Sequence, residues 1–147
     1  MKKFYPVILL SCLMILLFVS CKINSPDWVQ YKVYKDGTHY YKKVKIEKNE
    51  GKYIIQYWNK NIFSDEYKKE IIQILGKHGK SIKGWNELSH DMDLFEMDCK
   101  KNKYRILSSA LYNTYGDELY STSEEKPKWN NITPSSEMEL FQKTICK

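Results

Sequence analysis

The sequence contains little arginine and lacks the common catalytic motifs. Arg105 is the only arginine among 147 residues, although 24 positions are lysine or arginine. Proteins that bind nucleic acid rely heavily on the bidentate arginine fork, so this composition argues against a nucleic-acid partner. Neither the serine-hydrolase motif G-x-S-x-G nor the zinc motif H-E-x-x-H occurs. We therefore expect no enzyme and assign no catalytic residue, metal ligand or cofactor.

Long apolar runs are also scarce, and the one that is present has the proportions of a signal peptide. Met1-Lys2-Lys3 precedes a nearly unbroken apolar run over residues 4–19. That run is shorter than the roughly 20 residues that a membrane-spanning helix needs. It ends in Leu17-Phe18-Val19-Ser20-Cys21, which resembles the bacterial lipobox. The alternative is an uncleaved anchor helix with an incidental cysteine.

The lipobox resemblance implies that Cys21 is lipidated. In that motif the thiol accepts a diacylglycerol, cleavage makes the cysteine the first residue, and its amine receives a further acyl chain such as palmitate. Several acyl chains hold a protein firmly to a membrane, whereas one chain binds reversibly. We expect a signal peptide over residues 1–20, a lipidated tether over 21–26 and one domain over 27–147. The expected location is the bacterial cell envelope, at the surface or periplasmic face of the outer membrane.

Few cysteines remain after these assignments. Cys12 would leave with the signal peptide and Cys21 would be lipidated, so Cys99 and Cys146 are left. An even number of cysteines in an oxidising compartment favours a disulfide between them. Two buried free thiols are the alternative.

Strand patterns fill most of the remaining chain. The expected strands cover residues 28–34, 39–47, 53–58, 94–99, 104–112 and 119–122. Asp36-Gly37 predicts a two-residue hairpin turn in which Gly37 has a positive φ, and Asn49-Glu50-Gly51 predicts a second turn. The polar segment 77–93 is expected to be a loop or a ragged edge. Its histidines and aspartates, His78, His90, Asp91 and Asp93, do not have metal-site spacing and are expected to be solvated.

Two helices are predicted. Ser64 is a suitable N-cap for a helix over residues 65–75. The second helix is C-terminal, where Pro134 suits a first helical turn and Ser136 has capping-box spacing to Glu139. The apolar face of this second helix would consist of Met138, Phe141 and Ile145, and Cys146 would lie at its end.

The C-terminal half resembles a known family. M-D-C-K-K-N-K-Y-R-I-L (97–107) and W-N-N-I-T-P-S-S-E-M-E-L-F-Q-K-T-I-C (129–146) are similar to the bacterial surface-adhesin protein E family, and Trp28 and Tyr40-Tyr41 agree with its first strands. The resemblance implies an α+β fold: a curved antiparallel sheet of about six strands, with a C-terminal helix tied to it by a Cys99–Cys146 disulfide. It also implies a small lipoprotein that binds host matrix and plasma proteins.

Lysine clusters and aromatic residues suggest a binding surface. The lysines gather at positions 42, 43, 45 and 48 and at positions 100, 101 and 103. They are interpreted either as solvated faces that protect sheet edges or as a surface for anionic glycans, phospholipid heads or acidic proteins. The four tryptophans and twelve tyrosines suit either strands or an interface.

These features predict a lipid-anchored envelope protein that acts as a non-catalytic binding module. The main hypothesis is an adhesin for host or extracellular ligands, with a protein or an anionic glycan as partner. The alternative is a periplasm-facing accessory protein that binds a partner protein. The sequence leaves the ligand and the oligomeric state open, with a dimer among the compatible states.

Overall fold

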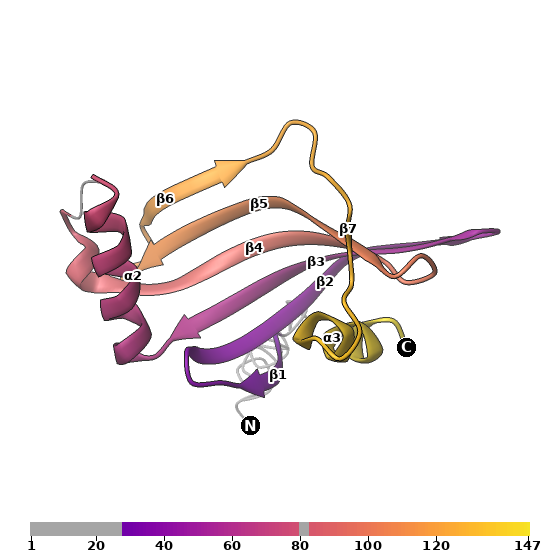
Figure 1. The fold of residues 1–147 in the computed structure, drawn as a ribbon, viewed down its shortest axis with the longest axis horizontal. Coiled ribbons are helices and arrows are strands. Elements are labelled where there is room, and N and C mark those ends of the chain that lie inside the picture. Colours follow the sequence, from indigo (N-terminus) through magenta and orange to yellow (C-terminus); the bar gives the residue numbers. More distant parts are fainter. Residues whose placement is uncertain (1–27, 80–82) are drawn as a thin grey trace, which may run out of the picture.

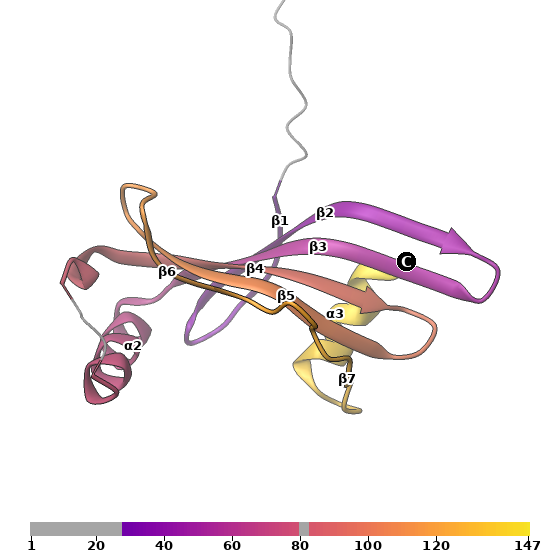
Figure 2. The same cartoon turned by 90° about the horizontal axis from the view of Figure 1, so that it is seen from above.

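The computed structural model describes residues 28–79 and 83–147. The predicted signal peptide and Cys21 lie outside the described residues. In the described part, the helices are too short or too polar to cross a membrane. One large antiparallel sheet dominates, and both α-helices lie on the same side of it (Figures 1 and 2).

The sheet is a meander of six strands with one short addition. The strands follow the order β1-β2-β3-β4-β5-β6, and β7 pairs with β5. Their bounds are β1 (Val29–Val33), β2 (Gly37–Asn49), β3 (Lys52–Phe63), β4 (Leu88–Asp98), β5 (Lys103–Asn113), β6 (Glu118–Ser123) and β7 (Asn130–Asn131). With the C-terminal helix and its disulfide, this confirms the predicted α+β fold class.

Strands β2 and β3 form a long hairpin that extends beyond the neighbouring strands (Figure 1). Strand β1 pairs only with residues 38–41 of β2, so the outer edge of β2 has no partner strand from Lys42 onward in the described part. The hairpin closes with Asn49 opposite Lys52, and Gly51 has a φ of 80°. The predicted turn at Asn49-Glu50-Gly51 is therefore confirmed, and the lysines of β2 lie along a free edge.

The first apolar cluster lies under the C-terminal helix α3 (Glu137–Ile145). Phe141 and Ile145 pack on β3 and β4, against buried residues that include Tyr57 and Met97. Cys146, at the C-cap, forms a disulfide with Cys99 directly after β4. The helix is thus attached to the sheet by apolar contacts along its length and by a covalent bond at its end.

The helix begins later than Pro134. Ser136 is the N-cap, and its hydroxyl accepts a hydrogen bond from the backbone N–H of Glu139 at 3.3 Å. Ser135 has a φ of 61°, which is left-handed backbone and interrupts a right-handed helix. The predicted cap is correct, but the expectation that Pro134 lies in the first helical turn is wrong.

The second apolar cluster lies under helix α2 (Asp65–Lys77). Ser64 caps α2 as predicted, accepting from the N–H of Tyr67 at 3.3 Å, and the helix continues two residues beyond the predicted end. Trp85, in the short 3₁₀ helix η2 (Trp85–Glu87), and Leu88 are only 5% and 1% exposed. They pack with Phe63 against one side of α2.

The prediction of a loop over residues 77–93 is wrong for its second half. Strand β4 begins at Leu88, because Leu88 is anchored in the second apolar cluster. Asp91 and Asp93 therefore lie in a strand, opposite Asn61 and Asn59 of β3. Asp91 and Asp93, which contribute to the loop-like composition of this segment, line a polar part of the sheet.

Gly37 is not in the predicted turn. The turn residues are Lys35 and Asp36, closed by a hydrogen bond from the Tyr34 N–H to the Gly37 carbonyl at 2.8 Å. Gly37 is the first residue of β2 and lies opposite Phe63, and it is absent from the glycines with positive φ. The prediction of a positive φ is wrong. The glycine is required instead because the Ile62 carbonyl occupies the space of a side chain.

Candidate binding site

A polar strip crosses the helix-bearing face between the two apolar clusters. It runs over the middle strands of the sheet and consists of His39, Asn59, Asn61, Asp91, Asp93 and Ser109. The Tyr31 hydroxyl donates to Asn59 Oδ1 at 3.0 Å, and the Ser109 hydroxyl donates to Asp93. Hydrogen bonds therefore pair several of the polar groups of the strip, whereas the buried Asn61 Oδ1 has no partner within the described residues.

The two aspartates of the strip have unusual protonation equilibria. Burial and the nearby charge of Asp93 raise the pKa of Asp91 to about 7, although the Asn61 N–H donates to its carboxylate at 3.0 Å. Burial also raises the pKa of Asp93, and the Ser109 hydroxyl partly opposes that change. The two neighbouring carboxyl groups on β4 are therefore protonated more readily in the folded state than in the unfolded chain.

This predicts a pH dependence of stability. The pKa of Asp91 is higher in the folded state than in the unfolded chain, so the folded state binds more protons between pH 4 and 7. The free energy of unfolding should fall as the pH rises through this range. Asp91→Asn should flatten the profile and raise stability at pH 8 by on the order of 2 kcal/mol. Urea unfolding from pH 4 to 8 measures this, and parallel profiles for the two proteins would contradict it.

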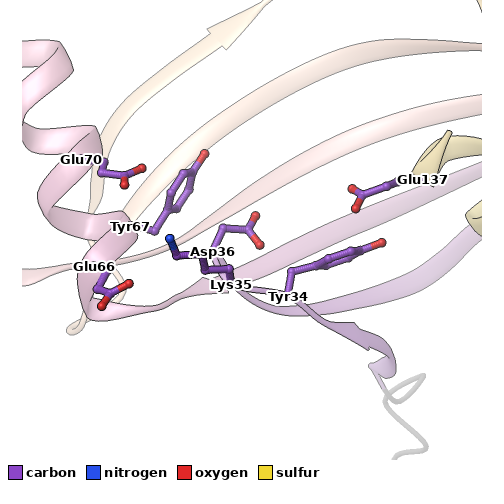
Figure 3. Close-up of a pocket in the computed structure, with 7 residues that line it drawn as sticks. All are labelled: Tyr34, Lys35, Asp36, Glu66, Tyr67, Glu70 and Glu137. Atoms are coloured by element: carbon purple, nitrogen blue, oxygen red, sulfur yellow. The ribbon is translucent and has the colours of Figure 1, made fainter.

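An acidic cleft lies at one end of this face, between α2 and α3 (Figure 3). Its volume is about 390 Å³, and it is lined by Tyr34, Lys35, Asp36, Glu66, Tyr67, Glu70 and Glu137. The carboxylates of Asp36, Glu70 and Glu137 turn toward the space between the helices. The cleft can accept a cationic group. Within residues 28–79 and 83–147, however, no three His, Cys, Asp or Glu side chains are arranged to hold a metal ion.

The opposite end of the sheet is basic. We call it the hairpin end, and it comprises the outer part of the β2–β3 hairpin and the β4–β5 turn. Its lysines are Lys42, Lys43, Lys45, Lys48, Lys52, Lys100, Lys101 and Lys103. A hollow of about 460 Å³ lies between the two hairpin tips, and Lys52, Lys101, Lys103 and Trp129 contribute to its lining. The folded chain thus brings together the two lysine clusters that are far apart in the sequence.

Most of this positive charge has no acidic partner. Lys52 pairs with Glu47 at 2.7 Å, but the other lysines of the hairpin end form no salt bridge within the described residues. The Asp98 carboxylate accepts the backbone N–H groups of Lys100 and Lys101 at 3.1 and 3.0 Å, so it shapes the turn beneath them. The geometry therefore presents unpaired cations to an anionic ligand.

Apolar groups accompany the lysines. Val44 and Ile46 on β2 are 52% and 53% exposed, and Trp129 stacks over Arg105, 4.6 Å from the guanidinium carbon to the ring centre. Arg105 in turn pairs with Glu96 at 2.6 Å. Exposed apolar and aromatic residues beside basic ones are typical of protein-binding surfaces.

Comparison with known proteins identifies the family. The family model of surface-adhesin protein E matches residues 28–147. The chain belongs to this family. Searches of curated proteins and of solved structures gave no match. The resemblance predicted from the two C-terminal segments is therefore confirmed, and the match extends through the N-terminal strands and α2.

The sequence predicted the structural residues of this family member more fully than the residues of its possible binding surfaces. Cys99 and Cys146 are joined as predicted, but they lie against the core and not on a binding surface. The sequence indicated each of the two lysine clusters separately. Their closeness in the folded chain depends on the register of the hairpins. Trp129 was missed as a surface residue, because only the short pairing of β7 with β5 places it beside Arg105.

Proposed function

We propose that this surface-adhesin protein E family member is a lipid-anchored, non-catalytic adhesin that binds anionic extracellular ligands through its hairpin end. Both kinds of ligand predicted from the sequence, an acidic protein surface or an anionic glycan, suit this site. The observation that carries the proposal is the projecting β2–β3 hairpin with its unpaired lysines. The name of the family supports a role in adhesion.

The arrangement suits attachment to a large ligand. The hairpin extends past the neighbouring strands (Figures 1 and 2), so a bulky partner can approach it without contacting the helices. Concentrated charge of one sign attracts an opposite surface over distance and orients the encounter. The exposed Val44 and Ile46 would then add apolar contact area once the ligand is bound.

A charge-matched pair of variants tests the proposal. The full-length lipoprotein, held in zwitterionic nanodiscs, is passed over immobilised heparin at 0.15 M salt. Replacing Lys45, Lys48 and Lys103 with glutamine should weaken binding between about threefold and a hundredfold, because exposed ion pairs at a binding surface contribute roughly 0.2–1 kcal/mol each. The control replaces three lysines elsewhere, Lys69, Lys77 and Lys126, with glutamine, and it should bind nearly as well as wild type.

The control distinguishes a local site from net charge. If both triple variants lose binding equally, affinity follows overall charge and the hairpin end is not the site. If neither variant loses binding, the proposed function fails at this surface. Raising the salt concentration should weaken wild-type binding in either case, since screening affects every exposed charge.

The lipid anchor is proposed from Val19-Ser20-Cys21 and the preceding apolar run. Cys21→Ser removes the acceptor thiol, so the variant should remain unprocessed or leave the membrane fraction. Detergent partitioning and intact-mass measurement of wild type and variant check this. A Cys21→Ser protein that is processed normally and still partitions into detergent would rule out lipidation at this residue.

A further inference from the structure

The face of the sheet opposite α2 and α3 carries a groove that the hairpin end does not include. No described helix covers this face (Figure 2). The groove has a volume of about 300 Å³ and crosses the strands from β3 to β6. Its large lining side chains are Trp58, Met92 and Tyr112, and its small ones are Ser108, Ala110 and Ser121. We call it the serine groove.

Strand register produces the shape of this groove. Lys60, Met92, Ala110 and Ser121 form one row across β3 to β6, and Trp58, Leu94, Ser108 and Ser123 form the next. Each row changes from large side chains on β3 and β4 to small ones on β5 and β6. The large side chains therefore form a wall beside a floor that is nearly at backbone level.

The groove has both apolar and polar surfaces for a ligand. Trp58 lies outside both apolar clusters of the fold and is half-buried, so part of its ring is open to a ligand. The Tyr112 ring is held by stacking on His90, with 5.2 Å between ring centres. The hydroxyl of Ser108 forms no hydrogen bond within the described part of the chain. Sugar rings have this dual character, because their C–H faces are apolar and their edges carry hydroxyls. Aromatic rings with a few polar groups are typical of small-ligand sites.

Charge along the groove differs between its two ends. Lys42 lies directly opposite Trp58, and Lys60 is on the next row; neither forms a salt bridge among the described residues. Lys60 also approaches the ring of Trp28, at 5.9 Å from its centre. At the other end Glu118 contributes a carboxylate to the lining. A ligand with an anion at one end and neutral hydroxyls at the other complements this distribution.

We propose that the serine groove binds a short oligosaccharide with one terminal acidic sugar. The sugar carboxylate would lie toward Lys42 and Lys60, a ring would stack on Trp58, and the following neutral sugar would lie over Ser108 and Ala110. Strands β3 and β6 are three spacings apart, about 14 Å, which suits two or three sugar units. The inference rests on the proposed function for an extracellular ligand, but it concerns the serine groove, which borders the hairpin end only at Lys42.

Sialyllactose, with lactose as its neutral counterpart, is the probe. Titration into the full-length lipoprotein in zwitterionic nanodiscs, followed by calorimetry, should detect sialyllactose binding. Lactose should bind at least about tenfold more weakly, because it lacks the carboxylate that would pair with the lysines; tenfold corresponds to about 1.4 kcal/mol. Trp58→Ala should weaken sialyllactose binding about tenfold or more, as expected for a central aromatic anchor. Tyr115→Ala is the matched control, because Tyr115 is an exposed aromatic in the β5–β6 turn, outside the groove.

Ala110→Gln provides a test that does not depend on the tryptophan. It fills the floor of the groove on a surface away from the core, so folding should be retained while sialyllactose binding is lost. Unchanged binding in both Trp58→Ala and Ala110→Gln would overturn the proposal. The proposal would also be overturned if the protein were a dimer that Trp58→Ala dissociates, because a second copy of the chain would then occupy this face. Loss of heparin binding in the hairpin variants with retained sialyllactose binding would separate the two surfaces.

Discussion

Reduction of the Cys99–Cys146 disulfide should lower the free energy of unfolding by about 4 kcal/mol, since the bond closes a loop with a sequence separation of 47 residues. We expect the largest effect on α3. A nine-residue helix is too short to be stable alone in water. Reduction should therefore release α3 first, while the β2–β5 part of the sheet stays folded longer.

Other contacts limit how far the helix can move. Gln142 Nε2 donates to Asn102 Oδ1 at 2.9 Å, and the Phe141 ring lies 4.6 Å from the Tyr31 ring and 5.0 Å from that of Tyr57, centre to centre. These contacts should keep α3 docked for part of the time after reduction. Loss of the bond is thus expected to increase opening of the helix without unfolding the whole domain.

Hydrogen exchange with and without reductant measures this difference. The amides of α3 should exchange faster after reduction, by a larger factor than the amides at the centre of β3. The Cys99→Ser/Cys146→Ser protein should behave like the reduced wild type. Equal acceleration in α3 and β3, or none in either, would contradict a disulfide that acts mainly on the helix.

Gly37→Ala should destabilise the protein by about 3 kcal/mol, at the upper end of the cost of overpacking. A Cβ atom at this position would overlap the Ile62 carbonyl oxygen and lie 2.5 Å from Asn61 Oδ1. The carbonyl is part of the backbone of β3, so it cannot move without disturbing the pairing of Gly37 with Phe63. Thermal or urea unfolding of the variant provides the measurement.

Gly51→Ala is the control, because it isolates the effect of backbone conformation. Gly51 has a φ of 80°, and a Cβ atom added there would have no other atom within 4 Å. The cost there should be about 1 kcal/mol, the typical penalty for a side chain in left-handed backbone. If Gly37→Ala costs no more than Gly51→Ala, the close approach to Ile62 does not constrain the fold.

The sequence predicted the fold well where pattern and local chemistry agree. The cap of α2 at Ser64 and the apolar face of α3 at Phe141 and Ile145 were both predicted, because each depends on residues close together in the chain. The pairing of Cys99 with Cys146 followed from the number of cysteines and from the family resemblance. Gly37 was recognised as structurally important, but for the wrong reason, since its close neighbour is 25 positions away in the sequence.

The binding surfaces were harder to predict, because they depend on register between strands. Asp91 and Asp93 lie in a segment with the composition of a polar loop, and only the pairing of β4 with β3 shows that they line a buried strip. Trp58 was assigned to a strand, but alternation alone does not say which face of a sheet is covered by helices. The serine groove likewise depends on four strands coming together in one register.

The central claim is that the hairpin end faces the exterior of the cell. Lysine labelling of intact cells tests this claim most directly. A membrane-impermeant, amine-reactive reagent is applied to cells that carry the full-length protein, and labelled peptides are mapped. The account predicts labelling at Lys43, Lys45 and Lys48 before permeabilisation, while a periplasmic protein of the same cells stays unlabelled. Labelling of these lysines only after permeabilisation would contradict a surface adhesin and would instead fit a protein that faces the periplasm.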